Sequence, residues 1–204
     1  MSADPIKHLS EADPRLARVI NTVGKYSMKR RTNAFQSLVE SIVYQQLAGA
    51  AAEVIYGRFI KYYNDLIPTP IQILSTPDME LKTKVGLSGK KVEYLKDLSS
   101  KIEDRRLGLD TLSTMTDEEV VDQLIQVKGI GRWTAEMFLI FCLGRTDVLP
   151  VTDLGVKKAI KTIYLLPEPP KPSEMLAISQ PWKPYRSIAT WYLWKSLSKF
   201  KSIG

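Results

Sequence analysis

The stretch that decides the fold is VKGIGRWTAE, residues 127–136, in which Gly129 and Gly131 stand one residue apart. The preceding segment, TDEEVVDQLIQ, pairs a threonine with a glutamate at the spacing of a capping box and repeats apolar residues at helical intervals. A dinucleotide-binding turn would need a strand before the glycines and a third glycine where Thr134 stands. The stretch therefore predicts a helix, a glycine hairpin and a second helix.

The rest of the chain carries helical patterns and no strand pattern. Asp13 followed by Pro14 predicts the start of a helix, and NAFQSLVESIVYQQL, residues 33–47, predicts another that includes Gln46. A further helix is expected after Gly49, packed antiparallel to the one before it. Four more follow: one that begins after Gly89 in GLSGKKVEYLKDLSSKI, the apolar TAEMFLIFCLG, which ends at Gly144, a helix that begins near Asp153, and the aromatic-rich last helix in WKPYRSIATWYLWKSLSKF. These patterns predict a compact all-α protein.

Composition limits the kinds of site and partner. The 204 residues are 44% hydrophobic and 25% charged, which suits a globular protein with a real core. One cysteine and one histidine exclude a disulfide framework, a zinc site built from those residues and a four-cysteine iron-sulfur cluster. The net charge of +7 permits a polyanionic partner, although surface lysines explain it equally well. Because the sequence shows neither a signal sequence nor a long apolar run, we expect an intracellular, soluble protein with no membrane partner.

The hairpin has the composition of an anion-binding site. Gly129 and Gly131 permit backbone angles and close approaches that a side chain would forbid, and they expose amides at the start of the next helix. Such amides bind phosphate, with help from the helix dipole and from Lys128 and Arg132 on either side. An ordinary tight turn between helices, which needs only one glycine, is the alternative.

Asp153 is the strongest candidate for chemistry. It stands twenty-two residues beyond Gly131, at the start of a predicted helix, where capping alone would explain it. The helix N-terminus also favours the ionised carboxylate, which suits Asp153 to stabilising a developing positive charge. His8 is expected in an N-terminal tail without a partner, so a serine or cysteine nucleophile is not predicted.

Aromatic residues are concentrated near the hairpin and in the predicted last helix. Most should belong to the core, and a few could line a pocket beside the carboxylate, where their faces would attract an electron-poor or cationic ring. They are Trp133, Trp182, Tyr185, Trp191, Tyr192 and Trp194.

The string VKGIGRWTAEMFLIFCLGRTDVLPVTDLGVKKAI, residues 127–160, resembles the signature of the helix-hairpin-helix DNA glycosylases, in the branch that removes alkylated purines, the 3-methyladenine DNA glycosylase II type. The resemblance extends from about Ala34 through QQLAGAAAE and GLSGKKVEYLKDL to the terminal WKPYRSIATWYLW, and so covers most of the chain. A glycine hairpin alone would be a weak signal. The hairpin followed by DVLPVTD at this spacing is a specific one.

The resemblance implies a role for each matching residue. Asp153 is implied as the catalytic carboxylate and Leu47 as the wedge that enters the duplex where the target nucleotide leaves. The implied DNA contacts are Gln46, Leu47, Lys128, Gly129, Ile130, Gly131, Arg132 and Thr134. The implied base pocket is lined by Trp133, Met137 and Trp194, with Met137 where some members have tyrosine. A monovalent cation, sodium or potassium, is implied on the backbone carbonyls of Ile125, Val127 and Ile130, with no other cofactor required.

The resemblance also implies an architecture and a reaction. It implies two helical lobes with a cleft between them, residues 31–143 in one and residues 1–30 plus 144–204 in the other, without an N-terminal β domain or an iron-sulfur cluster. Trp133 stands where strand-cleaving relatives carry a lysine nucleophile, which implies a monofunctional glycosylase of base excision repair acting on 3-methyladenine or 7-methylguanine type lesions. The implied partner is damaged double-stranded DNA, bound by a monomer that is cytoplasmic or nucleoid-associated in a prokaryote and nuclear in a eukaryote.

Three alternatives are also compatible with the sequence. A non-catalytic helix-hairpin-helix protein would bind DNA, with strong salt dependence, and leave no abasic product. A glycosylase with lyase activity on oxidised bases would form a covalent adduct that borohydride traps. A purely structural helical module would have no affinity for DNA.

Overall fold

The chain is all-α, as predicted. The structure, a computed structural model, describes residues 4–47 and 49–200, with side chains to residue 198, and this part of the chain contains no strand. In chain order the helices are α1 Pro5–Ala12, α2 Pro14–Val23, α3 Ala34–Tyr44, α4 Gly49–Tyr62, α5 Pro70–Ser75, α6 Asp78–Glu80, the π-helical η1 Leu81–Val85, α7 Gly89–Glu103, the 3-10 helix η2 Leu112–Thr114, α8 Asp117–Leu124, α9 Arg132–Phe138, the π-helical η3 Leu139–Leu143, α10 Leu154–Tyr164, α11 Pro172–Ile178, the 3-10 helix η4 Gln180–Trp182 and α12 Arg186–Phe200.

Several predicted helix boundaries are confirmed by their caps. Asp13 accepts hydrogen bonds from two amides at the start of α2, directly before Pro14. Thr116 and Glu119 form the reciprocal capping box of α8. Gly144 ends the run formed by α9 and η3 with a φ of +70°, which glycine adopts without strain.

Three predictions about the helices were wrong. His8 lies in a helix, α1, which starts with the same Asp-Pro signal as α2, and its Nε2 is 3.2 Å from the carbonyl of Pro181. α3 ends at Tyr44 rather than including Gln46, whose φ of +55° is left-handed. The last helix was predicted over WKPYRSIATWYLWKSLSKF, from Trp182, but α12 begins at Arg186, because the segment before it forms the short η4 and a turn.

The contacts divide the chain into two units. Unit 2 is Arg31–Phe138, and unit 1 combines Met1–Arg30 with Leu139–Gly204. The boundary at the end of unit 2 therefore falls between Phe138 and Leu139, five residues before the expected boundary after residue 143. At this point the α-helical turns of α9 give way to the π-helical η3.

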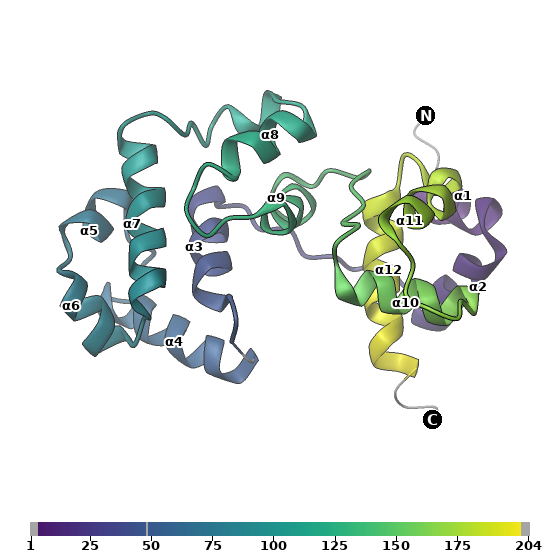
Figure 1. Cartoon of the computed structure of the whole chain (residues 1–204), viewed down its shortest axis with the longest axis horizontal. Helices are drawn as coiled ribbons and strands as arrows, with labels where there is room; N and C mark the ends of the chain where they lie inside the picture. The colour runs from purple at the N-terminus through teal and green to yellow at the C-terminus, as the bar shows by residue number, and fades with distance from the viewer. Residues whose placement is uncertain (1–3, 48, 201–204) are drawn as a thin grey trace. The chain divides into compact units, whose positions relative to one another are not determined.

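Unit 1 is built around α12. This helix packs against α2 and α10, and α1 packs against α2 (Figure 1). Its core is rich in aromatic side chains, since Trp182, Trp191 and Tyr192 are all buried. Three of the six aromatic residues noted in the sequence are therefore core residues, half of them rather than most, while Tyr185 and Trp194 are partly buried against this core.

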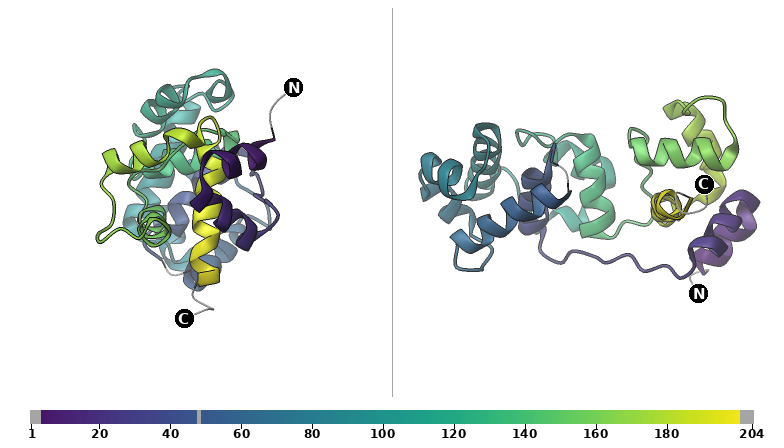
Figure 2. Two further views of the ribbon diagram at one scale, coloured as in Figure 1. Left: turned by 90° about the vertical axis from the view of Figure 1, so that its right-hand side faces the viewer. Right: turned by 90° about the horizontal axis from the view of Figure 1, so that it is seen from below.

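Unit 2 is built around α7. Figure 1 shows α7 between α5 and α3, and α8 packs against α9. Figure 2 shows residues 25–33, which form no helix, as an extended segment leading into α3. α3 buries Leu38, Val39, Ile42 and Val43, whereas α4 buries only Ala52 and Phe59.

The charge of the chain is distributed unevenly between the units. Unit 1 holds 16 of the basic and 7 of the acidic residues, a net charge of +9. Unit 2, which contains the hairpin, holds 13 basic and 15 acidic residues, a net charge of −2. The excess positive charge therefore belongs to the unit that contains Asp153.

Candidate nucleic-acid interface and active site

The glycine hairpin joins α8 to α9 in unit 2, as predicted, but its two glycines differ. Gly129 has a φ of +81°, and a Cβ placed there would overlap the ring of Tyr94. Gly131 has no left-handed φ, and a Cβ there would meet nothing within 4 Å. Of the two hairpin glycines, only Gly129 is required by the fold, and the open space at Gly131 leaves room for a ligand to approach the backbone.

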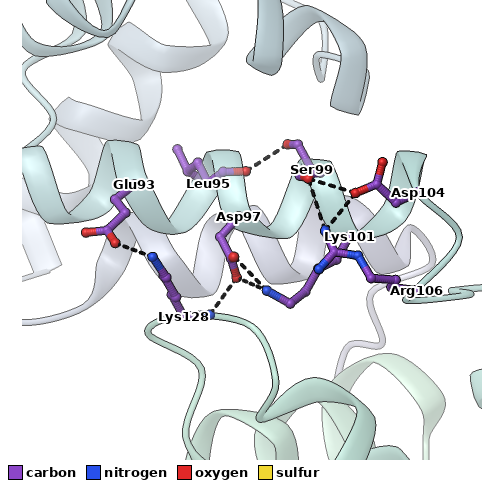
Figure 3. Close-up of polar contacts among 9 residues, drawn as sticks. Glu93, Leu95, Asp97, Ser99, Lys101, Asp104, Arg106 and Lys128 are labelled. Carbon is purple, nitrogen blue, oxygen red and sulfur yellow. Dashed lines mark hydrogen bonds and ion pairs between the residues drawn. The ribbon is translucent and has the colours of Figure 1, made fainter.

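The hairpin is held by one face of α7. The backbone amide of Lys128 donates to Oδ2 of Asp97 at 2.8 Å, and Nζ of Lys128 pairs with Oε1 of Glu93 at 2.7 Å (Figure 3). Lys101 donates to both oxygens of Asp97. Burial raises the pKa of Asp97, but the hydrogen bonds from Lys101 and from the Lys128 amide outweigh it, and the net shift is downward. Asp97 is therefore a fixed anion under the turn.

The two cations expected to flank a bound phosphate are already paired. Besides the pair between Lys128 and Glu93, Arg132 makes a two-pronged contact with Glu118 at 2.6 and 3.1 Å. The carboxylate of Glu93 raises the pKa of Lys128, and the carboxylate of Glu118 raises the pKa of Arg132. Because such exposed pairs contribute little free energy, a phosphate can replace the carboxylate as the partner.

The backbone at the start of α9 has the donors that an anion needs. The amide of Ala135 donates to the carbonyl of Gly131, the residue before α9, at 3.1 Å. The amides of Arg132, Trp133 and Thr134 belong to the first turn of α9, where the backbone N–H groups point toward the N-terminal end of the helix. The side chains of Ile130 and Thr134 are buried, so a DNA contact by either residue would come from its backbone.

The loop after α3 contains Gln46 and Leu47, which the resemblance implies as a DNA contact and as the wedge. Gln46 is exposed and Leu47 is partly buried. The preceding residue, Gln45, caps α3 and donates from Nε2 to the carbonyl of Gly129 at 2.7 Å. This loop and the hairpin are therefore in direct contact within unit 2.

Asp153 lies in unit 1 as the N-cap of α10, as predicted. Its Oδ1 accepts from the amide of Val156 at 2.7 Å and from the indole Nε1 of Trp194 at 3.0 Å. Gly155 leaves space for this arrangement, because a Cβ there would be 3.1 Å from Oδ1 of Asp153 and 3.2 Å from the Trp194 ring. The indole also stacks on Phe141, with ring centroids 5.7 Å apart. The carboxylate is therefore held by a backbone amide and by an oriented aromatic side chain.

The loop that leads to Asp153 is fastened to the start of α12. Arg186 donates to both carboxylate oxygens of Asp147, at 2.7 and 3.0 Å, and to its backbone carbonyl at 2.9 Å. Ser187 accepts from the amide of Val148 at 2.9 Å through its hydroxyl oxygen. The proline-containing loop before Asp153 is thus a fixed segment.

The other predicted site residues are divided between the units. Trp133 and Met137 lie on α9 in unit 2, where Trp133 is 46% exposed, and Trp194 lies on α12 in unit 1. A base pocket that all three line stays a prediction. Over residues 4–47 and 49–200, no group of three or more histidine, cysteine or acidic residues is arranged to hold a metal ion, and no helix is long and apolar enough to cross a membrane.

The sequence also matches the model of a known protein family. Residues 39–184 match the HhH-GPD superfamily of base excision DNA repair proteins, and this range includes the hairpin and Asp153. The chain belongs to this superfamily.

Relatives of this HhH-GPD protein include glycosylases. DNA-3-methyladenine glycosylase 1 of Schizosaccharomyces pombe is 35% identical over 93% of this chain and 85% of its own. The alkylbase DNA glycosidase-like protein mag2 of the same yeast is 32% identical over 93% of this chain and 91% of its own.

Solved structures give the same result for the fold of this HhH-GPD protein. The 3-methyladenine DNA glycosylase Mag1 of S. pombe, in complex with abasic DNA, aligns over 95% of this chain and 96% of its own, with a TM-score of 0.82 and 32% identity. A DNA-3-methyladenine glycosidase from Bacillus halodurans aligns over 98% of this chain and 92% of its own, with a TM-score of 0.87 and 36% identity.

The sequence did not reveal the residues that support the hairpin and Asp153. Tyr94, Asp97 and Gln45 fix the hairpin of this HhH-GPD protein, and Gly155 and Arg186 arrange the segment around Asp153. The only signal for two of them is that Tyr94 and Asp97 stand three residues apart, on one face of a helix. The bonds of Gln45 and Arg186 span 84 and 39 residues, and no local pattern predicts them.

Proposed function

We propose that this protein is a DNA glycosylase of base excision repair that hydrolyses the N-glycosidic bond of alkylated purines and leaves an abasic site. The observation that carries the proposal is the position of Asp153, at a helix N-cap with its Oδ1 bonded to Val156 and Trp194, in a chain of the HhH-GPD superfamily. The yeast and Bacillus relatives are named for activity on 3-methyladenine, which supports alkylated purines as the substrate class.

The mechanism follows from the charge of the lesion. Alkylation at N3 or N7 makes the base cationic, so the base leaves with little help from a general acid. The sugar then gains positive charge in an oxocarbenium-like transition state, and the fixed carboxylate of Asp153 stabilises that charge and orients the attacking water. The target nucleotide must first leave the base stack, since its glycosidic bond is inaccessible within the duplex.

The DNA is held, in this proposal, by the hairpin and the loop after α3. The amides at the start of α9 bind backbone phosphates, with Lys128 and Arg132 beside them, while Gln46 and the wedge Leu47 occupy the space that the flipped nucleotide leaves. Support comes from the open approach to Gly131 and from the relative Mag1, which was solved with abasic DNA. The flipped base would be stacked by Trp133, Met137 and Trp194, and the protein would act as a monomer.

A monovalent cation at the hairpin is part of the proposal. Its ligands would be the carbonyls of Ile125, Val127 and Ile130. α8 ends at Leu124 with Ile125 as its C-cap, and the last carbonyls of a helix lack intrahelical donors and carry partial negative charge. The carbonyl of Val127 accepts from the amide of Ile130 at 3.0 Å and retains a second lone pair for the ion. When bound, the cation would add positive charge beside the phosphate site.

The absence of strand cleavage rests on the residue at position 133. A lyase needs an amine that forms a Schiff base with the sugar, and Trp133 has none. Borohydride should therefore trap no covalent adduct between the protein and lesion-containing DNA. A trapped adduct would show instead a glycosylase with lyase activity.

The decisive experiment compares the native protein with Asp153→Asn in single-turnover release of 3-methyladenine and 7-methylguanine from duplex DNA. The substitution removes the charge and keeps a side-chain acceptor for the helix cap. The rate should fall by about a hundredfold to a thousandfold with unchanged DNA affinity. An unchanged rate would refute the role of Asp153, and no release by the native protein would leave a DNA-binding protein without glycosylase activity.

The lesion range is best measured with the same assay. A panel of duplexes containing 3-methyladenine, 7-methylguanine, ethenoadenine, hypoxanthine or 1-methyladenine separates cationic from neutral bases. Since the mechanism relies on the positive charge of the leaving base, the cationic lesions should be released fastest. If neutral hypoxanthine were released faster than the cationic lesions, the proposed mechanism, in which the charge of the base assists its departure and Asp153 stabilises the sugar, would be contradicted.

A further inference from the structure

The loop after α3 and the glycine hairpin are joined by a side chain that the proposed function does not use. Gln45 is the C-cap of α3, and its Nε2 donates to the carbonyl of Gly129 at 2.7 Å. Gln46 and Leu47 follow directly in the chain. One hydrogen bond therefore runs from the loop proposed to enter the duplex to the turn proposed to hold its backbone.

Both ends of this bond are supported by α7. Lys91, Tyr94 and Asp97 stand three residues apart, so they share a face of the helix. Lys91 is buried and donates from Nζ to the carbonyl of Val43, near the end of α3, at 2.7 Å. Tyr94 lies against Gly129, and Asp97 accepts from the amide of Lys128. These residues hold each loop against α7, whereas Gln45 connects one loop to the other.

The conformation of the loop depends on such support. Gln46 has a φ of +55°, a left-handed conformation that costs about 1 kcal/mol for a residue with a side chain. A residue persists in this region only when its surroundings hold it there. Gln45 is the residue directly before this strained position, so loss of its hydrogen bond would let the loop relax and would move Leu47.

We propose that Gln45 is a positioning residue that couples the grip of the hairpin on DNA phosphates to the insertion of Leu47. The inference rests on the proposed function, because it assigns the hairpin to phosphates and Leu47 to the duplex. A phosphate that orders the hairpin fixes the Gly129 carbonyl, and that carbonyl fixes Gln45 and the loop that follows. Coupling of this kind is reciprocal, so insertion of Leu47 must also strengthen the binding of backbone phosphates by the hairpin.

The first test measures binding by fluorescence anisotropy to two duplexes, one intact and one with a tetrahydrofuran abasic analogue. Gln45→Ala should keep the affinity for the intact duplex within about twofold and should lower the preference for the abasic analogue by about fivefold to tenfold, the effect of one net hydrogen bond. An equal loss of affinity for both duplexes would overturn the coupling, since it would indicate general loosening.

A matched control is available in the same region. Gln126 also donates from Nε2 to a backbone carbonyl, that of Asp122 at 3.2 Å, but this bond is local, since Gln126 lies just after the end of α8. Gln126→Ala should leave the preference for the abasic analogue unchanged. Gln45→Glu keeps the length of the side chain and turns a carboxylate toward the Gly129 carbonyl, so it should lower the preference at least as much as Gln45→Ala. A normal preference in Gln45→Glu would contradict the inference.

The second test is a double-mutant cycle in binding to the abasic analogue. Leu47→Ala removes the wedge, and Gly131→Ala obstructs the approach to the hairpin backbone. Their effects should be non-additive with Gln45 present and additive in the Gln45→Ala background. Non-additivity that survives without Gln45 would overturn the proposal.

The binding tests also distinguish failure of this inference from failure of the proposed function. They require no excision, so a protein that releases no base would still report the coupling. Conversely, excision by a native protein that shows no preference for the abasic analogue would support the glycosylase and overturn the role of Gln45.

Discussion

Trp194 Nε1 donates a hydrogen bond of 3.0 Å to Oδ1 of Asp153, from a residue 41 positions later in the chain. The indole is itself fixed by stacking on Phe141. The bond restricts the rotation of the carboxylate that we propose to stabilise the cationic sugar. Trp194 therefore has a role in orienting Asp153, separate from any contact with a flipped base.

The first prediction concerns this bond. Trp194→Phe keeps an aromatic ring next to Phe141 and removes the N–H donor. We expect the single-turnover excision rate to fall by about tenfold, since a hydrogen bond to a charged group contributes about 1.5 to 3 kcal/mol and the amide of Val156 still holds the carboxylate. The affinity for intact duplex DNA should not change.

Trp191→Phe is the control for Trp194→Phe. Trp191 lies on the same helix and is buried against Tyr26 and Tyr192. This substitution should lower the melting temperature and leave the excision rate unchanged. Equal rate losses in the two variants would show that α12 packing, rather than the indole hydrogen bond, controls the rate.

Local features of this site could be predicted from the sequence, and long-range ones could not. Capping signals act over three or four residues, which is why Asp153 and Thr116 are read correctly as N-caps. The same local rule applies to Asp4 before α1, a helix that was not predicted although its Asp-Pro signal is the same as that of α2. The left-handed turn at Gln46 and the bond from Gln45 to Gly129 depend on a helix elsewhere in the chain, and no local spacing encodes them.

The two hairpin glycines give the second prediction. Gly131→Ala should leave thermal stability unchanged and weaken duplex binding by about tenfold or more, because the new methyl group occupies space that is open in the free protein. Gly129→Ala should lower the free energy of unfolding by about 2 kcal/mol or more, because its left-handed φ and the Tyr94 ring both exclude a side chain.

Thermal melts and anisotropy titrations of the two glycine variants separate their roles. The expected result is a stable Gly131→Ala protein that binds poorly and an unstable Gly129→Ala protein. Normal DNA affinity in Gly131→Ala would remove the phosphate assignment and favour the ordinary tight turn. An unchanged melting temperature in Gly129→Ala would contradict the packing of Tyr94 against the hairpin.

The third prediction follows from the uneven charge. Unit 1 carries +9 and unit 2 carries −2, so lysines of unit 1 should dominate the electrostatic attraction to DNA. Replacing Lys158 and Lys161 of α10 by Gln should reduce the slope of log affinity against log salt by about 0.9 for each phosphate that the variant no longer neutralises. Lys82 and Lys90 of unit 2, replaced in the same way, provide a control with the same change in net charge.

Binding titrations between low and moderate salt concentrations decide between the two pairs. The unit 1 variant should have the shallower slope, and the unit 2 variant should keep nearly the native slope. Equal slopes would show that net charge alone, regardless of its position, sets the affinity, and a larger effect in unit 2 would contradict the prediction.

The fourth prediction concerns Asp13 and acid stability. This buried carboxylate caps α2 and accepts from the indole of Trp182 at 2.8 Å and from the hydroxyl of Tyr164. Burial raises the pKa of Asp13, but the hydrogen bonds outweigh it and the net shift is downward. The unfolded chain then binds a proton more readily, so the stabilisation is complete above the ordinary pKa near 4 and is lost as the pH falls through the lower folded value.

Urea unfolding of the native protein and of Asp13→Asn, from pH 7 to pH 2.5, measures this contribution. Asn keeps a cap acceptor and loses the charge, so the variant should be about 2 kcal/mol less stable at pH 7. The difference should shrink below pH 4, where Asp13 binds a proton in the unfolded chain while it is still ionised in the folded protein. Asp4→Asn, at the exposed cap of α1, should change the stability by less than about 1 kcal/mol. A difference between native and Asp13→Asn that stays constant down to pH 2.5 would show that the charge of Asp13 does not stabilise the fold.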